Sequence, residues 1–300
     1  MGRFVKWLLG FVAAWRVFGP IITPRFPAPQ EHPWKVPGRT VFVGDLEFLV
    51  RQVGDPSKPD VVLIHGLGGA SLTEWHEVGP LLADDFRLTI VENRNHGLSP
   101  RVTSRYRIED TADDVAGVMS AVGVDRAHVV GYSMGGTVAQ ALAHQHPDKV
   151  DRLALIATTA AHSPAWKWSR MFGAVIVRAW ERITGTGTPE VRAAYLLLRG
   201  AVGREHAKFL WDESQRRDPD GGAAATMALL RFDSRRWLST LGNPTLVMIP
   251  ARDQLLFPRW QLDMATRLPR ATVEKIEGAY HEVVWTHAEL IADRLRAFFA

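Results

Sequence analysis

The sequence predicts an α/β protein with a mostly parallel central sheet and helices on both faces. Short runs rich in β-branched residues alternate with helical segments along most of the chain, which is the pattern of strand-helix-strand units. Several of these runs are apolar throughout, as expected for strands that are buried on both faces. With 300 residues, of which 46% are apolar, the chain can also bury a sizeable core.

The regular strand and helix patterns begin at Thr40. Residues 40–54 predict two strands joined at Gly44-Asp45, because glycine and aspartate favour tight turns. The other predicted strands cover residues 60–66, 87–93, 127–133, 150–158, 245–250 and 272–278. The predicted helices cover residues 74–83, 108–122, 135–146 and 283–299.

The alternation stops between His162 and Leu241. This stretch is helical in composition and contains no convincing strand, so we interpret it as a helical cap (lid) inserted between two strands of the sheet. The expected organisation is an N-terminal arm over residues 1–39, a core over 40–161, the cap over 162–240 and the second part of the core over 241–300.

The N-terminal arm differs from the rest of the chain. Its aromatic residues fall on one side of a helix and its basic residues on another, so this helix would be amphipathic, and six prolines then predict an extended linker. The uncharged run Trp7–Trp15 is far shorter than the roughly 20 apolar residues that span a bilayer. We favour an interfacial membrane helix; a helix packed on its own protein and a secretory signal segment are the alternatives.

The net charge of +4 is concentrated in the arm. The first 40 residues hold six basic side chains and a single glutamate, so the remainder of the chain is nearly neutral. Outside the arm we therefore expect no basic stripe and no nucleic-acid partner. The chain has no cysteine, which excludes disulfide frameworks and cysteine metal sites. The oligomeric state is left open by the sequence.

A serine lies between glycines where a predicted strand turns into a predicted helix. In the motif GYSMG (residues 131–135), glycines at both ends remove Cβ atoms that would clash in a tight turn, and the helix start aims backbone N–H groups at whatever Ser133 attacks. Ser133 is therefore a candidate nucleophile. The alternative is a glycine-rich packing turn with an incidental serine.

A serine hydroxyl is a weak nucleophile and needs a base together with a group that orients the base. Asp253 and His281 each follow a predicted strand, so each is expected on a loop at the carboxyl edge of the sheet, where ligands of open α/β sheets bind. No Asp or Glu lies near the end of the strand over residues 150–158, which leaves Asp253 as the candidate acid. Glu282, next to His281, is expected at the surface.

With its motifs in this order, the sequence resembles the α/β-hydrolase fold family, in its serine-nucleophile carboxylesterase and lipase branch with a helical lid. The resemblance covers residues 40–300 and is carried by HGLGG (65–69), GYSMG (131–135), PARDQLLFP (250–258) and EGAYHE (277–282). It implies the catalytic residues Ser133, Asp253 and His281 and an oxyanion hole formed by the backbone N–H groups of Leu67 and Met134. It implies no cofactor and no metal.

The segment ENRNHGLS (residues 92–99) resembles the family segment that usually reads D-x-R-G-H-G-x-S. Glu92 stands for the aspartate and Asn95 for the second glycine. We interpret this segment as structural: Gly97 shapes a turn, while His96 and Ser99 tie the loop by hydrogen bonds.

A serine beside a His-Asp pair favours acyl transfer through a covalent ester. Tryptophans in the cap and in the arm, including Trp34, favour apolar or lipidic acyl esters, although docking of the cap on the core would explain most of those in the cap. Thioesters and phospholipids are alternative substrates, and a ligand-binding receptor with incidental hydrolysis is the alternative from another class. The arm favours a peripheral membrane or cell-envelope location, with the cytoplasm as the alternative.

Overall fold

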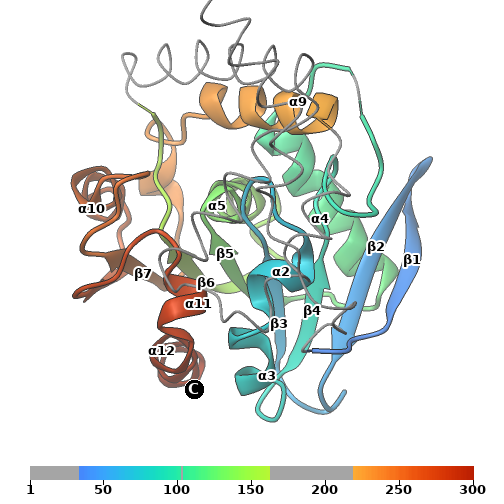
Figure 1. The fold of residues 1–300 in the computed structure, drawn as a ribbon, viewed down its shortest axis with the longest axis horizontal. Coiled ribbons are helices and arrows are strands. Elements are labelled where there is room, and N and C mark those ends of the chain that lie inside the picture. Colours follow the sequence, from blue (N-terminus) through green and yellow to red (C-terminus); the bar gives the residue numbers. More distant parts are fainter. Residues whose placement is uncertain (1–33, 103, 163–218) are drawn as a thin grey trace, which may run out of the picture. The chain divides into compact units, whose positions relative to one another are not determined.

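The computed structural model describes residues 34–102, 104–162 and 219–300, and its centre is an eight-stranded sheet (Figure 1). The strands are β1 (Gly38–Val43), β2 (Leu46–Val53), β3 (Asp60–Ile64), β4 (Arg87–Val91), β5 (Ala127–Tyr132), β6 (Val150–Ile156), β7 (Thr245–Pro250) and β8 (Ala271–Ile276). Their order in the sheet is β1-β2-β4-β3-β5-β6-β7-β8. All neighbours from β4 to β8 are parallel, whereas β1 pairs with β2 and β2 with β4 in antiparallel register, so the predicted fold class is confirmed.

The middle of the sheet is buried on both faces, as the apolar strand sequences predict. Val61 to Ile64 of β3 are fully buried between β4 and β5. At the edge, β1 and β2 form the predicted hairpin, which turns at Gly44 with a φ of 57°. Glycine adopts this left-handed conformation without the steric cost that other residues incur.

Helices cover both faces of the sheet (Figure 1). They are α2 (Ser71–Trp75), α3 (Val78–Leu82), α4 (Ile108–Ala121), α5 (Met134–Gln145), α9 (Pro219–Arg231), α10 (Pro258–Thr266), α11 (Val283–Thr286) and α12 (Ala288–Phe299), with a 3₁₀ turn over Leu238–Thr240. Helices α4 and α5 pack against each other on one face, while α3 and α12 pack together on the other. The α5 helix lies against β5 and β6, which places its first turn beside the carboxyl ends of these strands.

Three helical segments differ from the sequence prediction. The helix expected over residues 74–83 is split into α2 and α3, because Pro80 has no N–H to donate to the carbonyl of His76. The closing helix is interrupted at His287, which has a φ of −135° and separates α11 from α12. Helix α10, which packs on β7 and β8, was not predicted at all.

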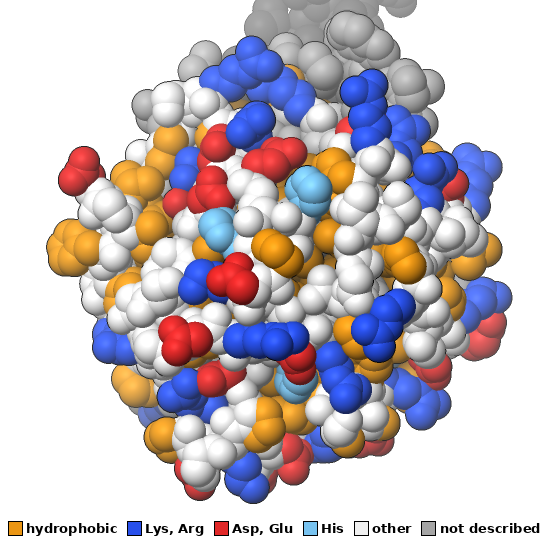
Figure 2. All heavy atoms as spheres, turned by 180° about the vertical axis from the view of Figure 1, so that it is seen from behind, with side chains coloured by type: hydrophobic (Ala, Val, Ile, Leu, Met, Phe, Trp, Pro, Cys, Tyr) orange, Lys and Arg blue, Asp and Glu red, His pale blue; other side chains and the backbone are white. Residues whose placement is uncertain are grey.

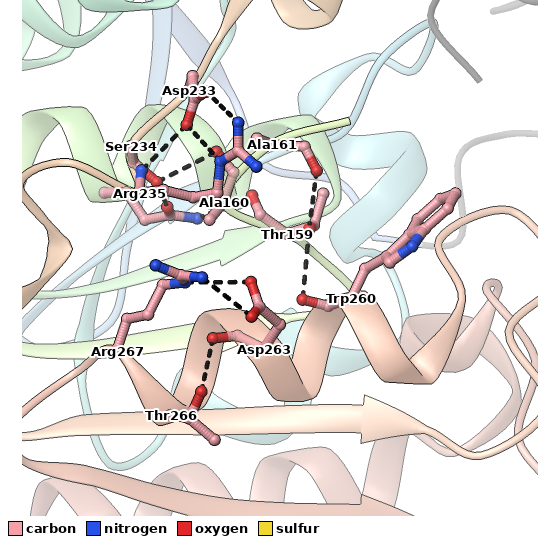
Figure 3. Close-up of polar contacts among 11 residues, drawn as sticks. Thr159, Ala160, Ala161, Asp233, Ser234, Arg235, Trp260, Asp263, Thr266 and Arg267 are labelled. Atoms are coloured by element: carbon pink, nitrogen blue, oxygen red, sulfur yellow. Dashed lines mark hydrogen bonds and ion pairs between the residues drawn. The ribbon is translucent and has the colours of Figure 1, made fainter. Parts of the chain in front are cut away.

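Residues just before the predicted cap contact residues near its end, beside the core (Figure 3). The backbone N–H and Oγ of Ser234 donate to the carbonyl of Ala160 at 3.0 and 3.2 Å, and Ala161 pairs with Asp233 in an isolated β-bridge. Helix α9 adds Ala225 and Ala228 to the apolar core. Residues 160–161 and residues 233–234 are therefore neighbours in the structure, although more than 70 positions separate them in the chain.

Most of the predicted arm and cap lies outside the described residues, including the aromatic face of the arm and Trp166, Trp168, Trp180 and Trp211 of the cap. Trp34 is described, and its ring lies directly over Gly79 of α3: a Cβ atom on that glycine would be 2.1 Å from the ring. Val36 is buried and β1 begins at Gly38. Within the described part of the chain, no helix is both long and apolar enough to cross a membrane.

Basic and acidic side chains are interspersed on the face seen in Figure 2. Several surface arginines are paired with carboxylates, among them Arg126 with Asp151 and Arg294 with Glu274, each at 2.7 Å. The described surface therefore carries mixed charge.

Candidate active site

Ser133 occupies a strained turn between β5 and α5. Its φ of 54° and ψ of −118° lie outside the regions that L-residues ordinarily adopt, at a cost on the order of 1–3 kcal/mol. The flanking glycines make the turn possible: a Cβ on Gly131 would be 2.4 Å from the carbonyl oxygen of Gly135, and a Cβ on Gly135 would be 2.1 Å from the carbonyl oxygen of Ile64. The glycines therefore serve the tight turn that the sequence predicted.

The structure brings Ser133, His281 and Asp253 together. Asp253 follows β7 and His281 follows β8, as predicted, and both loops lie at the same edge of the sheet as Ser133. The Nε2 atom of His281 is 3.0 Å from the Oγ of Ser133, and the Nδ1 atom is 2.8 Å from Oδ2 of Asp253. The Asp253 side chain is fully buried, whereas 16% of the His281 side chain is exposed. These contacts form one continuous hydrogen-bond chain.

Backbone groups fix the carboxylate of Asp253. Its Oδ1 accepts hydrogen bonds from the backbone N–H groups of Leu255 and Leu256, both at 2.8 Å. Its Oδ2 accepts the hydrogen bond from His281. An ionised carboxylate is an acceptor at both oxygens, which matches this set of donors. The imidazole Nδ1 therefore carries the proton, and Nε2 is free to accept the proton of Ser133.

The predicted oxyanion loop runs beside the serine. A Cβ on Gly66 would lie 3.2 Å from the Cβ of Ser133, and Leu67 is the next residue. Met134 is the first residue of α5, where backbone N–H groups have no partner within the helix. The backbone N–H groups of Leu67 and Met134 remain the predicted oxyanion donors.

Two buried histidines hold the predicted oxyanion loop, HGLGG (65–69), in place. The Nε2 of His65 accepts the backbone N–H of Asn93 at 3.0 Å, and the Nε2 of His96 accepts the backbone N–H of Gly68 at 3.1 Å. Each Nδ1 lies within 2.9 Å of a carbonyl oxygen, so we assign both rings as neutral with the proton on Nδ1. His96 thus ties the ENRNHGLS segment (residues 92–99) to the predicted oxyanion loop.

The ENRNHGLS segment forms the structural loop that the sequence predicted. The carboxylate of Glu92 accepts the backbone N–H groups of Ser71 at 3.3 Å and of Leu98 at 3.2 Å. Asn95 has a φ of 62°, the left-handed conformation that suits the glycine it replaces and that asparagine tolerates. Ser99 donates to the carbonyl of Glu92 at 2.7 Å, so the loop is closed on itself.

Two contacts near His281 were not predicted from the sequence. The hydroxyl of Tyr132 donates to the carbonyl of His281 at 2.9 Å, and the indole N–H of Trp285 donates to the carbonyl of Thr73 at 2.8 Å. The aromatic residue before Ser133 was the available signal, but its hydroxyl partner is 149 positions away in the chain. The surface position expected for Glu282 is wrong: Glu282 is 5% exposed because it directly precedes α11, whose first residues are buried.

The described residues contain no group of three His, Asp or Glu side chains arranged to share a metal ion. The chemistry that the observed geometry permits is proton transfer from Ser133 to His281, with Asp253 stabilising the protonated imidazole.

Comparison with known proteins gives one consistent result. A family model described as alpha/beta hydrolase fold matches residues 59–288. A protein of Caulobacter sp. strain K31, with the provisional name carbamate hydrolase RutD, is 31% identical over 242 residues, which are 77% of this chain and 88% of that protein. A pimeloyl-[acyl-carrier protein] methyl ester esterase of Chromobacterium violaceum is 31% identical over 239 residues, covering 77% of this chain and 90% of the relative.

A solved structure shares the same architecture. The enol-lactonase from Burkholderia xenovorans LB400 superposes with a TM-score of 0.75 and 25% identity, covering 87% of this chain and 99% of that one.

Proposed function

We propose that this chain, which is a hydrolase and belongs to the α/β-hydrolase fold family, cleaves carboxylic esters with Ser133, His281 and Asp253 as its catalytic triad. The observation that carries the proposal is the hydrogen-bond chain from Ser133 to His281 at 3.0 Å and from His281 to Asp253 at 2.8 Å. It is supported by the strained turn that presents Ser133 at the start of a helix.

The proposed cycle has two halves. The Oγ of Ser133 attacks the carbonyl carbon of the ester while His281 takes the proton of this hydroxyl. The resulting oxyanion accepts hydrogen bonds from the backbone N–H groups of Leu67 and Met134. Collapse expels the alcohol, which receives the proton from His281. Water then attacks the acyl-enzyme by the same steps, which releases the acid and restores Ser133. Each oxyanion donor contributes on the order of 3 kcal/mol.

For the substrate we propose apolar acyl esters. The 31% identical methyl ester esterase supports an ester with an acyl group, and the tryptophan-rich cap and arm support an apolar or lipidic acyl chain. Thioesters and phospholipid acyl esters lie within reach of the same chemistry. The arm, with its basic and aromatic residues, is proposed to contact membranes peripherally.

Carbamate cleavage is the second candidate. It is favoured by the 31% identical Caulobacter protein whose provisional name is carbamate hydrolase. A carbamate also presents a carbonyl carbon with a leaving group, so the same serine, base and oxyanion donors would serve it.

Multiple-turnover assays test the proposal. The panel contains short and long acyl esters, a matched acyl thioester, a phospholipid and a carbamate, each assayed with the wild type and with Ser133→Ala. We expect the highest kcat/KM on an acyl ester, with kcat reduced on the order of 10⁴ to 10⁶-fold in Ser133→Ala. A preference for the carbamate would support the second candidate. Stoichiometric binding with no turnover on any substrate would instead support the receptor class.

A further inference from the structure

We propose that Gln261 is a positioning residue that fixes the carboxylate of Asp253 for His281. The inference rests on the proposed function, because it assigns Gln261 a role in the triad described above. Gln261 lies in the first turn of α10, the helix that the sequence did not predict, and its side chain is fully buried.

The amide of Gln261 donates to the same oxygen that His281 uses. Its Nε2 is 3.0 Å from Oδ2 of Asp253 and 2.7 Å from the carbonyl oxygen of Leu256. Together with the two backbone N–H groups on Oδ1, this gives the carboxylate four donors. Gln261 is the donor among these that comes from outside the 253–256 loop and does not take part in proton transfer.

The orientation of the Gln261 amide is determined by its surroundings. Reversing the amide would direct its oxygen at Asp253 and at the Leu256 carbonyl, which are both acceptors, so Nε2 must face them. The other amide atom, Oε1, is buried and accepts no hydrogen bond from any described residue. An unsatisfied buried acceptor costs stability, so this glutamine is a poor choice for packing alone.

The position of Gln261 in α10 supports the same conclusion. Gln261, Met264 and Ala265 are the buried residues of this helix and share its inner face. A methionine or leucine at 261 would match that face. The competing explanation is that Gln261 only donates a hydrogen bond to the carbonyl of Leu256. In that case, replacing Gln261 would change the stability of the protein but not kcat or its pH dependence.

The hydrogen bond to Oδ2 has two effects on the triad. It fixes the rotation of the carboxylate, so that Oδ2 faces His281 before substrate binds. It also shares the negative charge of Asp253, so the carboxylate attracts a protonated His281 less strongly. Without the hydrogen bond from Gln261, His281 would stay protonated to higher pH. The active form, with neutral His281, would therefore appear only at higher pH.

The test compares two buried glutamines changed to methionine. Gln261→Met keeps the length of the side chain and removes the donor. Gln140→Met is the matched control, because Gln140 is also fully buried and hydrogen-bonds Thr159, Ser234 and Met264 rather than the triad. We expect both variants to have a lower Tm. In Gln261→Met alone, we expect kcat to fall about tenfold with KM within about twofold, and the acid limb of the kcat/KM profile to move to higher pH.

Gln261→Glu provides a second measurement. Two carboxyl groups this close cannot both ionise readily, so the introduced group should stay protonated at low pH and donate to Asp253. We expect this variant to exceed Gln261→Met in kcat/KM at pH 6 and to lose that advantage as the pH rises. The inference is overturned if both Gln261 variants keep the wild-type kcat and acid limb. A separate outcome, undiminished turnover in Ser133→Ala, would instead remove the proposed function itself.

Discussion

At the level of single residues, the geometry of the site depends on glycines, which let neighbouring backbone segments approach closely. Ser133 is held at a φ of 54° because the glycines at 131 and 135 let the backbone of α5 lie against β5 and β3. Asp253 is held by two backbone N–H groups of its own loop. The backbone near Ser133 and Asp253 thus contributes directly to the placement of these two side chains.

The role of Asp253 predicts a specific kinetic defect. Asp253→Asn should lower kcat by about 10⁴-fold, because an amide would favour the histidine tautomer that directs N–H rather than the lone pair at Ser133. The measurement is steady-state hydrolysis of a short soluble ester, with circular dichroism as the control for folding.

Glu282→Gln is the matched control for Asp253→Asn, because Glu282 is also buried and directly follows His281. We expect a change in kcat below about tenfold, since Asp253 rather than Glu282 accepts the hydrogen bond from the imidazole. If Glu282→Gln proved as damaging as Asp253→Asn, the acid would have been assigned to the wrong residue.

The candidate site could be predicted where short motifs coincide with strand ends. Ser133, Asp253 and His281 each follow a β-branched run, and parallel strands bring their carboxyl ends to one edge. The contact of Tyr132 with His281 and the contact of Gln261 with Asp253 could not be predicted. Both depend on the direction of a side chain between segments that sequence periodicity does not align.

At the scale of helices, strands and loops, the strands were predicted best because buried β-branched runs are short and distinctive. Helices were predicted less well. The break between α2 and α3 could have been predicted, because the sequence shows a proline at position 80 and proline has no backbone N–H. Helix α10 is harder to predict, because its buried face is short and consists of Gln261, Met264 and Ala265. A buried glutamine weakens the apolar pattern by which such a helix is recognised.

The loop contact between His96 and Gly68 should affect catalysis moderately. His96→Ala removes the acceptor of the Gly68 N–H and loosens the loop next to Leu67. We expect kcat to fall about tenfold, which corresponds to about 1.4 kcal/mol. His144→Ala serves as the control, because the ring of His144 stacks on Trp237, with 4.3 Å between the ring centroids, instead of contacting the Gly68 loop. Wild-type kcat in His96→Ala would show that the loop is fixed without this histidine.

The segment before α4 predicts a stability change at alkaline pH. Burial raises the pKa of Tyr106 to about 12, while the hydrogen bond from Asn95 and the charge of Arg94 oppose this shift. The unfolded chain releases this proton near pH 10 and the folded chain retains it, so stability is lost as the pH rises from about 10 to about 12. The total is about 2 to 3 kcal/mol.

Tyr106→Phe isolates this contribution. Urea unfolding at pH 9 and pH 11 should show the wild type losing about 1 kcal/mol more than the variant over this interval. Equal losses in the two proteins would mean that Tyr106 ionises similarly in the folded and unfolded chains. The prediction concerns the difference between the two pH values, so the cost of removing the hydroxyl cancels.

At the scale of the whole molecule, the question is what the N-terminal arm does. Trp34 packs over Gly79 and Val36 is buried, so both residues belong with the folded core. A shortened chain should therefore begin at Pro33 rather than after Trp34. The remaining arm, with its predicted aromatic face and its basic residues, is proposed to bind anionic membrane surfaces at about 1 kcal/mol per basic residue.

Shortening the chain to begin at Pro33 should separate location from chemistry. We expect kcat/KM on a short soluble ester to be nearly unchanged, because the triad and oxyanion positions follow residue 33. Sedimentation with anionic vesicles should decrease strongly. If the helix instead packs on its own protein, sedimentation would stay equal and the Tm would fall, and that result would exclude the membrane role.

Mass spectrometry after reaction with a fluorophosphonate shows whether Ser133 is the nucleophile of a serine hydrolase. Such reagents phosphonylate an activated serine and spare an ordinary hydroxyl. We expect one adduct per chain, located by peptide mapping on Ser133, and no adduct on Ser133→Ala. An adduct on another residue, or undiminished labelling of Ser133→Ala, would contradict this assignment.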